Sequence, residues 1–204
     1  MTLLERVQTH LTDAKRKGRI SSLPPPASPI ETAAAEARIG FPLPHTMKNF
    51  YNQIANGGFG PMGGFLGVPS AGALTDWNLV QAYELLSGNP YYHGGAWPSR
   101  LLPAIDCGHE VFFCVDCSHP AYRMIRLDVD NACLEESDFG DHDREHWPFP
   151  LHPCRRMYRL AAPSLEQFVA SWLEDEECSS RDDDRLTGRD LARFAKRLAS
   201  TAAR

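Results

Sequence analysis

Apolar residues recur at every third or fourth position in several stretches of the chain, a spacing that is typical of helices with one buried face. The stretches span residues 3–15, 29–39, 44–56, 76–87 and 164–174. The third of them shows the pattern clearly, because its apolar face consists of Met47, Phe50, Tyr51 and Ile54. We therefore predict five amphipathic helices.

The predicted helix over residues 29–39 has end signals at both termini. Ser28 is placed to act as the N-cap, Pro29 takes the first helical position, and Glu31 completes a capping box. Gly40 follows, where a residue in the left-handed conformation ends many helices. The apolar stripe expected to pack against a neighbour consists of Ile30, Ala33, Ala34 and Ala37.

Two other helices also have recognisable starts. Thr75 or Asp76 is predicted to cap the helix over residues 76–87, and Ser164 with Gln167 forms a second capping box. The helix over residues 44–56 ends at Asn56, where a glycine-dense turn begins. Asparagine and glycine tolerate the left-handed backbone that such a reversal needs.

Three apolar runs separated by short turns predict strands: LLPAID, EVFFCVD and AYRMIRLD. The middle run is apolar from Val111 to Val115, which favours a central strand buried on both faces. Short turns imply antiparallel pairing. Residues 65–68 and 157–160 are further short strand candidates. We predict an α+β fold, with a mostly antiparallel sheet of about four to six strands flanked by helices.

The chain divides into three parts by composition. Residues 1–27 hold a helix and a proline-rich connector, which we interpret as an extended spacer. Residues 28–177 hold the predicted sheet and its helices, and we treat them as one domain. Residues 178–204 form a basic tail with a helical pattern.

Three motifs follow one another in a distinctive order. The first is E-x-R-I-G-F-P-L-P with F-Y-x-x-I-A-N-G-G-F-G-P, at residues 36–61. The second is W-P-x-x-x-L-P-x-x-D-x-G at residues 97–108, and the third is the helix PSLEQFVASWL at residues 163–173. Together they resemble the SUKH superfamily of Smi/Knr-like proteins over residues 28–177.

This resemblance implies a SUKH-like single domain that binds proteins and is not an enzyme. The family has no general set of catalytic residues, and the resemblance implies no cofactor. Its bacterial members are typically immunity proteins that neutralise polymorphic or contact-dependent toxins. Its eukaryotic members are linked to the regulation of cell-wall synthesis.

The net charge of −5 is unevenly distributed along the chain. Residues 1–20 contain five basic residues against two acidic ones, and residues 178–204 contain seven against four, so residues 21–177 have a net charge of −11. An acidic body argues against nucleic acid as a ligand and is compatible with a basic protein partner. The sequence contains neither a membrane span nor a secretory signal, and we expect a cytoplasmic protein.

Six cysteines occur without an export signal, which favours reduced thiols. Five potential zinc ligands lie close together in the sequence: Cys107, His109, Cys114, Cys117 and His119. However, strand alternation sends Cys114 and Val115 to opposite faces of the sheet, so one core cysteine and one turn cysteine give a simpler account. We expect no metal site here.

Two surface segments are candidates for binding a partner. One is an acidic loop that contains Asp138, Asp141, Asp143 and Glu145, and it lacks the spacing of a calcium-binding loop. The other is an aromatic loop with Tyr91, Tyr92 and Trp97. Aromatic and exposed charged side chains are both common in interfaces.

The chain lacks the common motifs of nucleophilic, nucleotide-binding and metalloprotease sites. Our leading hypothesis is an immunity-type protein that blocks a basic toxin domain by direct binding. One alternative is a regulatory scaffold that binds a host enzyme and uses the terminal helices. The other is a metal-dependent hydrolase built on the cysteine and histidine residues between positions 107 and 119.

Overall fold

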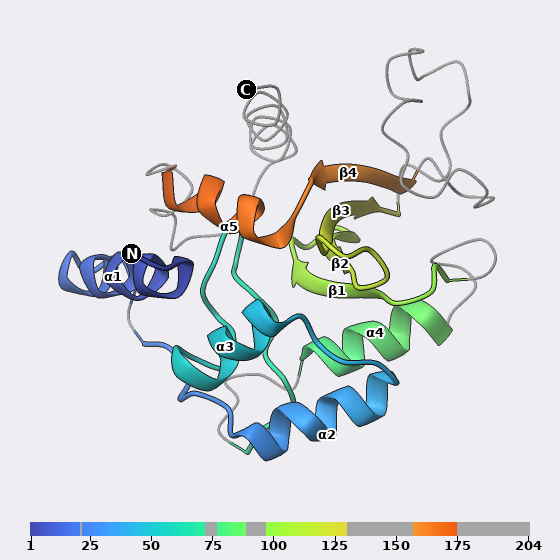
Figure 1. Ribbon diagram of the computed structural model, residues 1–204, viewed down its shortest axis with the longest axis horizontal. Coiled ribbons are helices and arrows are strands. Elements are labelled where there is room, and N and C mark those ends of the chain that lie inside the picture. The colour runs from blue at the N-terminus through green and yellow to red at the C-terminus, as the bar shows by residue number, and fades with distance from the viewer. Residues whose placement is uncertain (21, 72–76, 89–96, 130–156, 175–204) are drawn as a thin grey trace, which may run out of the picture.

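The computed structural model describes residues 1–20, 22–71, 77–88, 97–129 and 157–174. Helices precede and follow a four-stranded sheet in the order α1 Leu3–Arg16, α2 Pro29–Ile39, α3 His45–Gln53, α4 Leu79–Gly88, β1 Leu101–Asp106, β2 Val111–Asp116, β3 Arg123–Asp128, β4 Tyr158–Ala162 and α5 Leu165–Glu174. In Figure 1 the sheet lies between α5, beside β4, and the pair α2 and α4, below β1. The predicted α+β fold is confirmed.

The sheet has the order β1-β2-β3-β4, and every neighbouring pair is antiparallel. β2 is buried along its whole length, as predicted for a central strand. Alternate residues of β2 join two separate apolar clusters, with Phe113 in one and Phe112 in the other. We call the face of Phe113 the helix-covered face, because its ring lies 5.2 Å from that of Phe168 on α5. The other is the opposite face.

Helix α2 has the predicted bounds, and its two end signals are confirmed. The Ser28 amide donates to Glu31 Oε2 at 2.7 Å, the Glu31 amide donates to Ser28 Oγ, and Gly40 has a φ of 85°. The predicted packing stripe is wrong. Ile30 is 82% exposed, and the alanines at positions 33, 34 and 37 are exposed as well.

The residues that α2 buries instead are Thr32, Ala35 and Ile39. Alanine occurs on every side of this helix, so the apolar pattern does not fix which side faces the core. The chain after the helix decides the phase, because Phe41 and Leu43 are both buried and orient the last turn toward α3 and α4. The packing of Phe41 and Leu43 therefore decides which side of α2 is buried, because alanine side chains favour burial only weakly.

Helix α4 begins three residues later than predicted, at Leu79. The predicted caps at positions 75 and 76 lie outside the described residues. Asn78 caps the helix instead, because its Oδ1 accepts from the Gln81 amide at 3.1 Å and Gln81 Oε1 accepts from the Asn78 amide at 3.2 Å. This reciprocal pair is a capping box. The α5 cap is as predicted, with Ser164 Oγ accepting from the Gln167 amide at 3.0 Å.

The glycine-dense turn after α3 is fixed by Asn56. Its side chain makes the two hydrogen bonds with the Val68 backbone that a neighbouring strand residue would make. Nδ2 donates to Val68 O at 2.9 Å, and Oδ1 accepts from Val68 N at 2.8 Å. Gly67 passes so close that a Cβ there would lie 2.3 Å from Asn56 O. The predicted strand over residues 65–68 is reduced to one bridge between Phe65 and Ile105.

The N-terminal residues pack onto the rest of the described chain. Helix α1 forms as predicted and contacts α5 and α3, with Val7 and Leu11 buried in the helix-covered cluster. The proline-rich segment is bonded to the end of α3, because the Ala27 amide donates to Tyr51 O at 2.9 Å and Pro25 O accepts from the Asn56 amide at 3.1 Å. The basic tail over residues 178–204 lies outside the described residues.

Candidate interaction surface

Of the seven residues predicted to contact a partner, the structure describes Trp97. Tyr91, Tyr92, Asp138, Asp141, Asp143 and Glu145 lie outside the described residues. Trp97 is half-buried against the opposite-face cluster, and its indole Nε1 donates to Leu101 O at 2.9 Å. Trp97 therefore covers part of the opposite face of the sheet. Its role in binding a partner stays a prediction.

The cysteines and histidines of the possible zinc set are described but do not converge. Cys114 is buried in the opposite-face cluster, whereas Cys117 is buried in the helix-covered cluster. Cys107 is partly buried against the helix-covered cluster, with its Sγ 3.8 Å from Met62 Sδ. Within the described residues, no three His, Cys, Asp or Glu side chains are grouped so that they could hold a metal ion.

Burial also makes the described thiols poor metal ligands and nucleophiles. It raises the pKa of Cys107 to about 12, although Arg126 opposes this shift, and it raises the pKa of Cys117 to about 12. The pKa of Cys114 is also raised well above its usual value, again by burial. Because the thiolate is the reactive form, these cysteines behave as core residues.

An ion pair between Asp116 and Arg123 stabilises the end of β2. The buried Asp116 carboxylate accepts from both Nε and Nη2 of Arg123 and from the hydroxyl and amide of Ser118. Burial alone would raise the pKa of Asp116, but these hydrogen bonds hold it below its usual value. With so many partners, this carboxylate ties β2 to the following turn and to β3.

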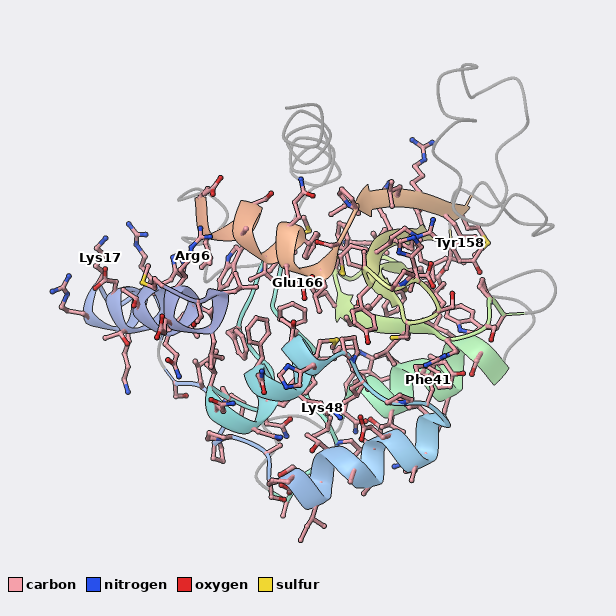
Figure 2. The ribbon with its side chains drawn as sticks, in the orientation of Figure 1. Arg6, Lys17, Phe41, Lys48, Tyr158 and Glu166 are labelled. Carbon is pink, nitrogen blue, oxygen red and sulfur yellow. The ribbon has the colours of Figure 1, made fainter. Side chains whose placement is uncertain are left out.

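A second polar group interrupts the helix-covered face of the sheet. We call it the arginine cluster, and it consists of Arg126, Asp128 and Arg159. Arg126 is paired in register with Phe113 on β2 and with Arg159 on β4, so these side chains share one face of the sheet. Tyr158, the residue before Arg159, marks this end of β4 in Figure 2.

The arginine cluster is partly desolvated. The side chain of Arg126 is 20% exposed and that of Asp128 is 10% exposed, and Arg126 Nη2 donates to Asp128 Oδ2. Arg126 Nε is buried and has no hydrogen-bond partner in the described chain. Arg159 is half-buried beside it. The cluster therefore presents guanidinium groups at a site where the adjacent rows of the sheet are apolar.

A tight turn borders the arginine cluster. The β1–β2 turn contains three successive residues with positive φ, namely Gly108 at 73°, His109 at 50° and Glu110 at 58°. Glu110 O accepts from the Val129 amide at 3.2 Å, which joins this turn to the end of β3 beside Asp128. Met62, at 55°, belongs to the glycine-dense turn that contacts Cys107. Non-glycine residues with positive φ are uncommon and often mark functional surfaces.

The sequence shows only half of this cluster. The alternation of polar and apolar residues in R-M-I-R-L-D places Arg126 and Asp128 on one face of a strand. Arg159 could not be assigned to that face from the sequence, because its strand is short and distant in the chain.

The comparisons with known proteins identify a family. The model of the SMI1 / KNR4 family (SUKH-1) matches residues 26–171. The match spans all four strands, begins after α1 and ends within α5. No curated protein matches the chain. Among the described residues, no helix is long and apolar enough to cross a membrane.

Proposed function

The chain belongs to the SMI1 / KNR4 family (SUKH-1), and we propose that it is an immunity-type protein that neutralises a toxin domain by direct binding. The family match over residues 26–171 is the observation on which the proposal depends. In this role the protein acts in the cytoplasm of a bacterium as a binding module without catalytic activity. The family as a whole supports protein binding.

The negative charge of residues 21–177 supports a basic partner. Residues 21–177 have a net charge of −11, because the two basic ends carry the compensating positive charges. Many nuclease toxins are basic, and opposite charges on two proteins speed their association and favour the correct orientation. We therefore expect the association rate to fall as salt is added, because salt screens charges separated by more than about 10 Å at 0.1 M.

Co-expression with the toxin domain encoded beside its gene tests the proposal. We expect the protein to restore growth of cells that express the toxin, and to co-purify with a catalytically inactive form of that toxin. An unrelated toxin domain of similar charge serves as the control, and it should be neither bound nor neutralised. Absence of both protection and binding with the neighbouring toxin would refute the proposal.

A second candidate function is a regulatory scaffold that binds a host enzyme. The position of α1 favours it, because this helix lies outside the matched region and still packs into the core through Val7. Deletion of residues 178–204 separates the two functions. A scaffold that uses the basic tail should lose its partner, whereas an inhibitor that binds through the domain surface should retain it.

A further inference from the structure

Arg100 is an exposed arginine whose position is set by an aromatic ring. It is the last residue before β1, and its backbone is fixed because the Cys117 amide donates to Arg100 O at 2.9 Å. The guanidinium carbon lies 5.6 Å from the centre of the Phe41 ring. Phe41 packs edge-on against Tyr83 of α4, with ring centres 5.5 Å apart. We call Arg100, Phe41 and Tyr83 the Arg100 patch.

The donors of Arg100 are open to a partner. Two nearby arginines are already filled, because Arg38 binds both carboxylate oxygens of Glu84 and Arg123 binds Asp116 through Nε and Nη2. By contrast, the side chain of Arg100 makes no hydrogen bond and no ion pair within the described chain. A guanidinium stacks on a ring through its flat face, and its N–H groups point outward in its plane. The stack therefore orders Arg100 and leaves its donors in solvent.

The backbone of Arg100 is unfavourable for an arginine. Its φ is 60°, a conformation that glycine adopts without strain and that other residues adopt rarely. Tyr122, which precedes β3 at the same end of the sheet, has a φ of 50°. Arginine and tyrosine are also the residue types found most often at binding hot spots. Side chains that are retained at a cost to folding are expected at functional sites.

We propose that Arg100 binds a carboxylate side chain of the protein partner, with Phe41 as its platform. A carboxylate offers two oxygens in the plane that the guanidinium donors require. This contact rests on the proposed function and deepens it. The net charge of −11 over residues 21–177 attracts a basic partner from a distance, and a single arginine in the contact then selects the register in which an aspartate or glutamate faces it.

The apolar base of the Arg100 patch strengthens such a contact. Phe41 is 9% exposed and Tyr83 is half-buried, so a protein that covers Arg100 excludes water from the ion pair on both sides. Hydrogen bonds to charged groups are stronger in such a desolvated site. A phosphate has oxygens similar to those of a carboxylate, but the negative charge of residues 21–177 disfavours a nucleic acid as its source.

Binding to the neighbouring toxin domain tests the role of Arg100. Arg100→Gln should bind it at least about tenfold more weakly than wild type. The matched control is Lys17→Gln, which removes the same charge from an exposed position at the end of α1, on the side of the molecule away from Phe41 in Figure 2. The control should bind as wild type does. Arg100→Lys keeps the charge, loses the planar donors and should recover only part of the affinity.

A double-mutant cycle identifies the carboxylate. Each exposed aspartate or glutamate of the toxin domain is changed to its amide, and one of these changes should be coupled to Arg100→Gln and additive with Lys17→Gln. If no acidic residue of the toxin is coupled to Arg100, the assignment to a carboxylate is wrong. Binding of a duplex DNA oligonucleotide that depends on Arg100 and weakens steeply with salt would also overturn it.

Arg100→Gly separates binding from folding. Glycine accepts the positive φ, so this variant should unfold in urea at the same midpoint as wild type or a higher one, while it binds the toxin at least about tenfold more weakly. A lower midpoint with unchanged binding would assign Arg100 to the fold and overturn the proposal. If Arg100→Gln and wild type bind the toxin equally, Arg100 is not the contact and the proposed function stands. Failure of the wild type to bind would refute the proposed function, and this contact with it.

Discussion

Replacement of Asn56 by alanine should destabilise the protein strongly, although the residue lies in a turn. Its side chain makes two hydrogen bonds with the backbone of Val68, at 2.9 and 2.8 Å. Asn56 is 5% exposed and Val68 is fully buried, so water cannot readily replace the lost groups. The substitution leaves one N–H and one C=O group of Val68 buried without these partners.

The expected loss follows from the cost of each unpaired group. A buried donor or acceptor left without a partner costs about 1–3 kcal/mol, so the two together give a loss of about 2–6 kcal/mol in the free energy of unfolding. This is a large part of the roughly 5–15 kcal/mol that a typical domain has in total. The matched control is Asn49→Ala, because Asn49 is partly exposed and bonds to His45 through its side chain, at 3.1 Å. It should change the free energy by about 0.5 kcal/mol or less.

Urea unfolding followed by circular dichroism measures both variants against wild type. Asn56→Asp adds a sharper comparison, since it keeps the acceptor for Val68 N but turns a second oxygen toward Val68 O. The contact between the two oxygens raises the pKa of the new carboxyl in the folded state. Asn56→Asp should therefore destabilise the protein less at low pH, where the protonated acid can donate to Val68 O. A loss below about 1 kcal/mol for Asn56→Ala would refute this explanation of the turn.

Three further predictions concern other parts of the fold. Val7→Ala should lower the free energy of urea unfolding by about 1–3 kcal/mol, whereas a small effect would mean that α1 is not docked in solution. Because the pKa of Asp116 is lowered in the folded state, its carboxylate stabilises the protein at pH values above its unfolded pKa of about 3.9. This contribution is lost as the pH falls through the folded pKa. Asp116→Asn should abolish this pH dependence of the free energy of unfolding, measured in unfolding curves over a series of pH values. Cys114 and Cys117 should be alkylated by iodoacetamide far more slowly in the native than in the unfolded chain, by peptide mass spectrometry, and equal rates would contradict their burial.

Local signals in the sequence were sufficient for much of the fold. Ser28 and Gly40 mark the ends of α2 because capping depends on residues within one turn of each other. The apolar run of β2 identified the central strand for a similar reason, since burial on both faces removes the need for alternating polar residues. The family match agrees with the motifs, which are largely the turns and helix ends of the same elements.

Features that depend on distant contacts could not be predicted. Ile30 is exposed because the phase of α2 is set by packing after Gly40 and not by its alanines. The start of α4 was misplaced because several polar residues precede it, and Asn78 becomes the cap through its bond with Gln81. The pairing of Arg126 with Arg159 requires the register of two strands, which no local pattern specifies.

The short bridge between Phe65 and Ile105 has a consequence for self-association. β1 is an outer strand of the sheet, and an outer strand with free backbone groups can template pairing with another chain. Here Leu66 N donates to Ala104 O at 2.8 Å, and Pro103 has no amide hydrogen to offer. The bridge and the proline together interrupt the row of backbone groups that an added strand would pair with, so this edge is a poor template for strand addition.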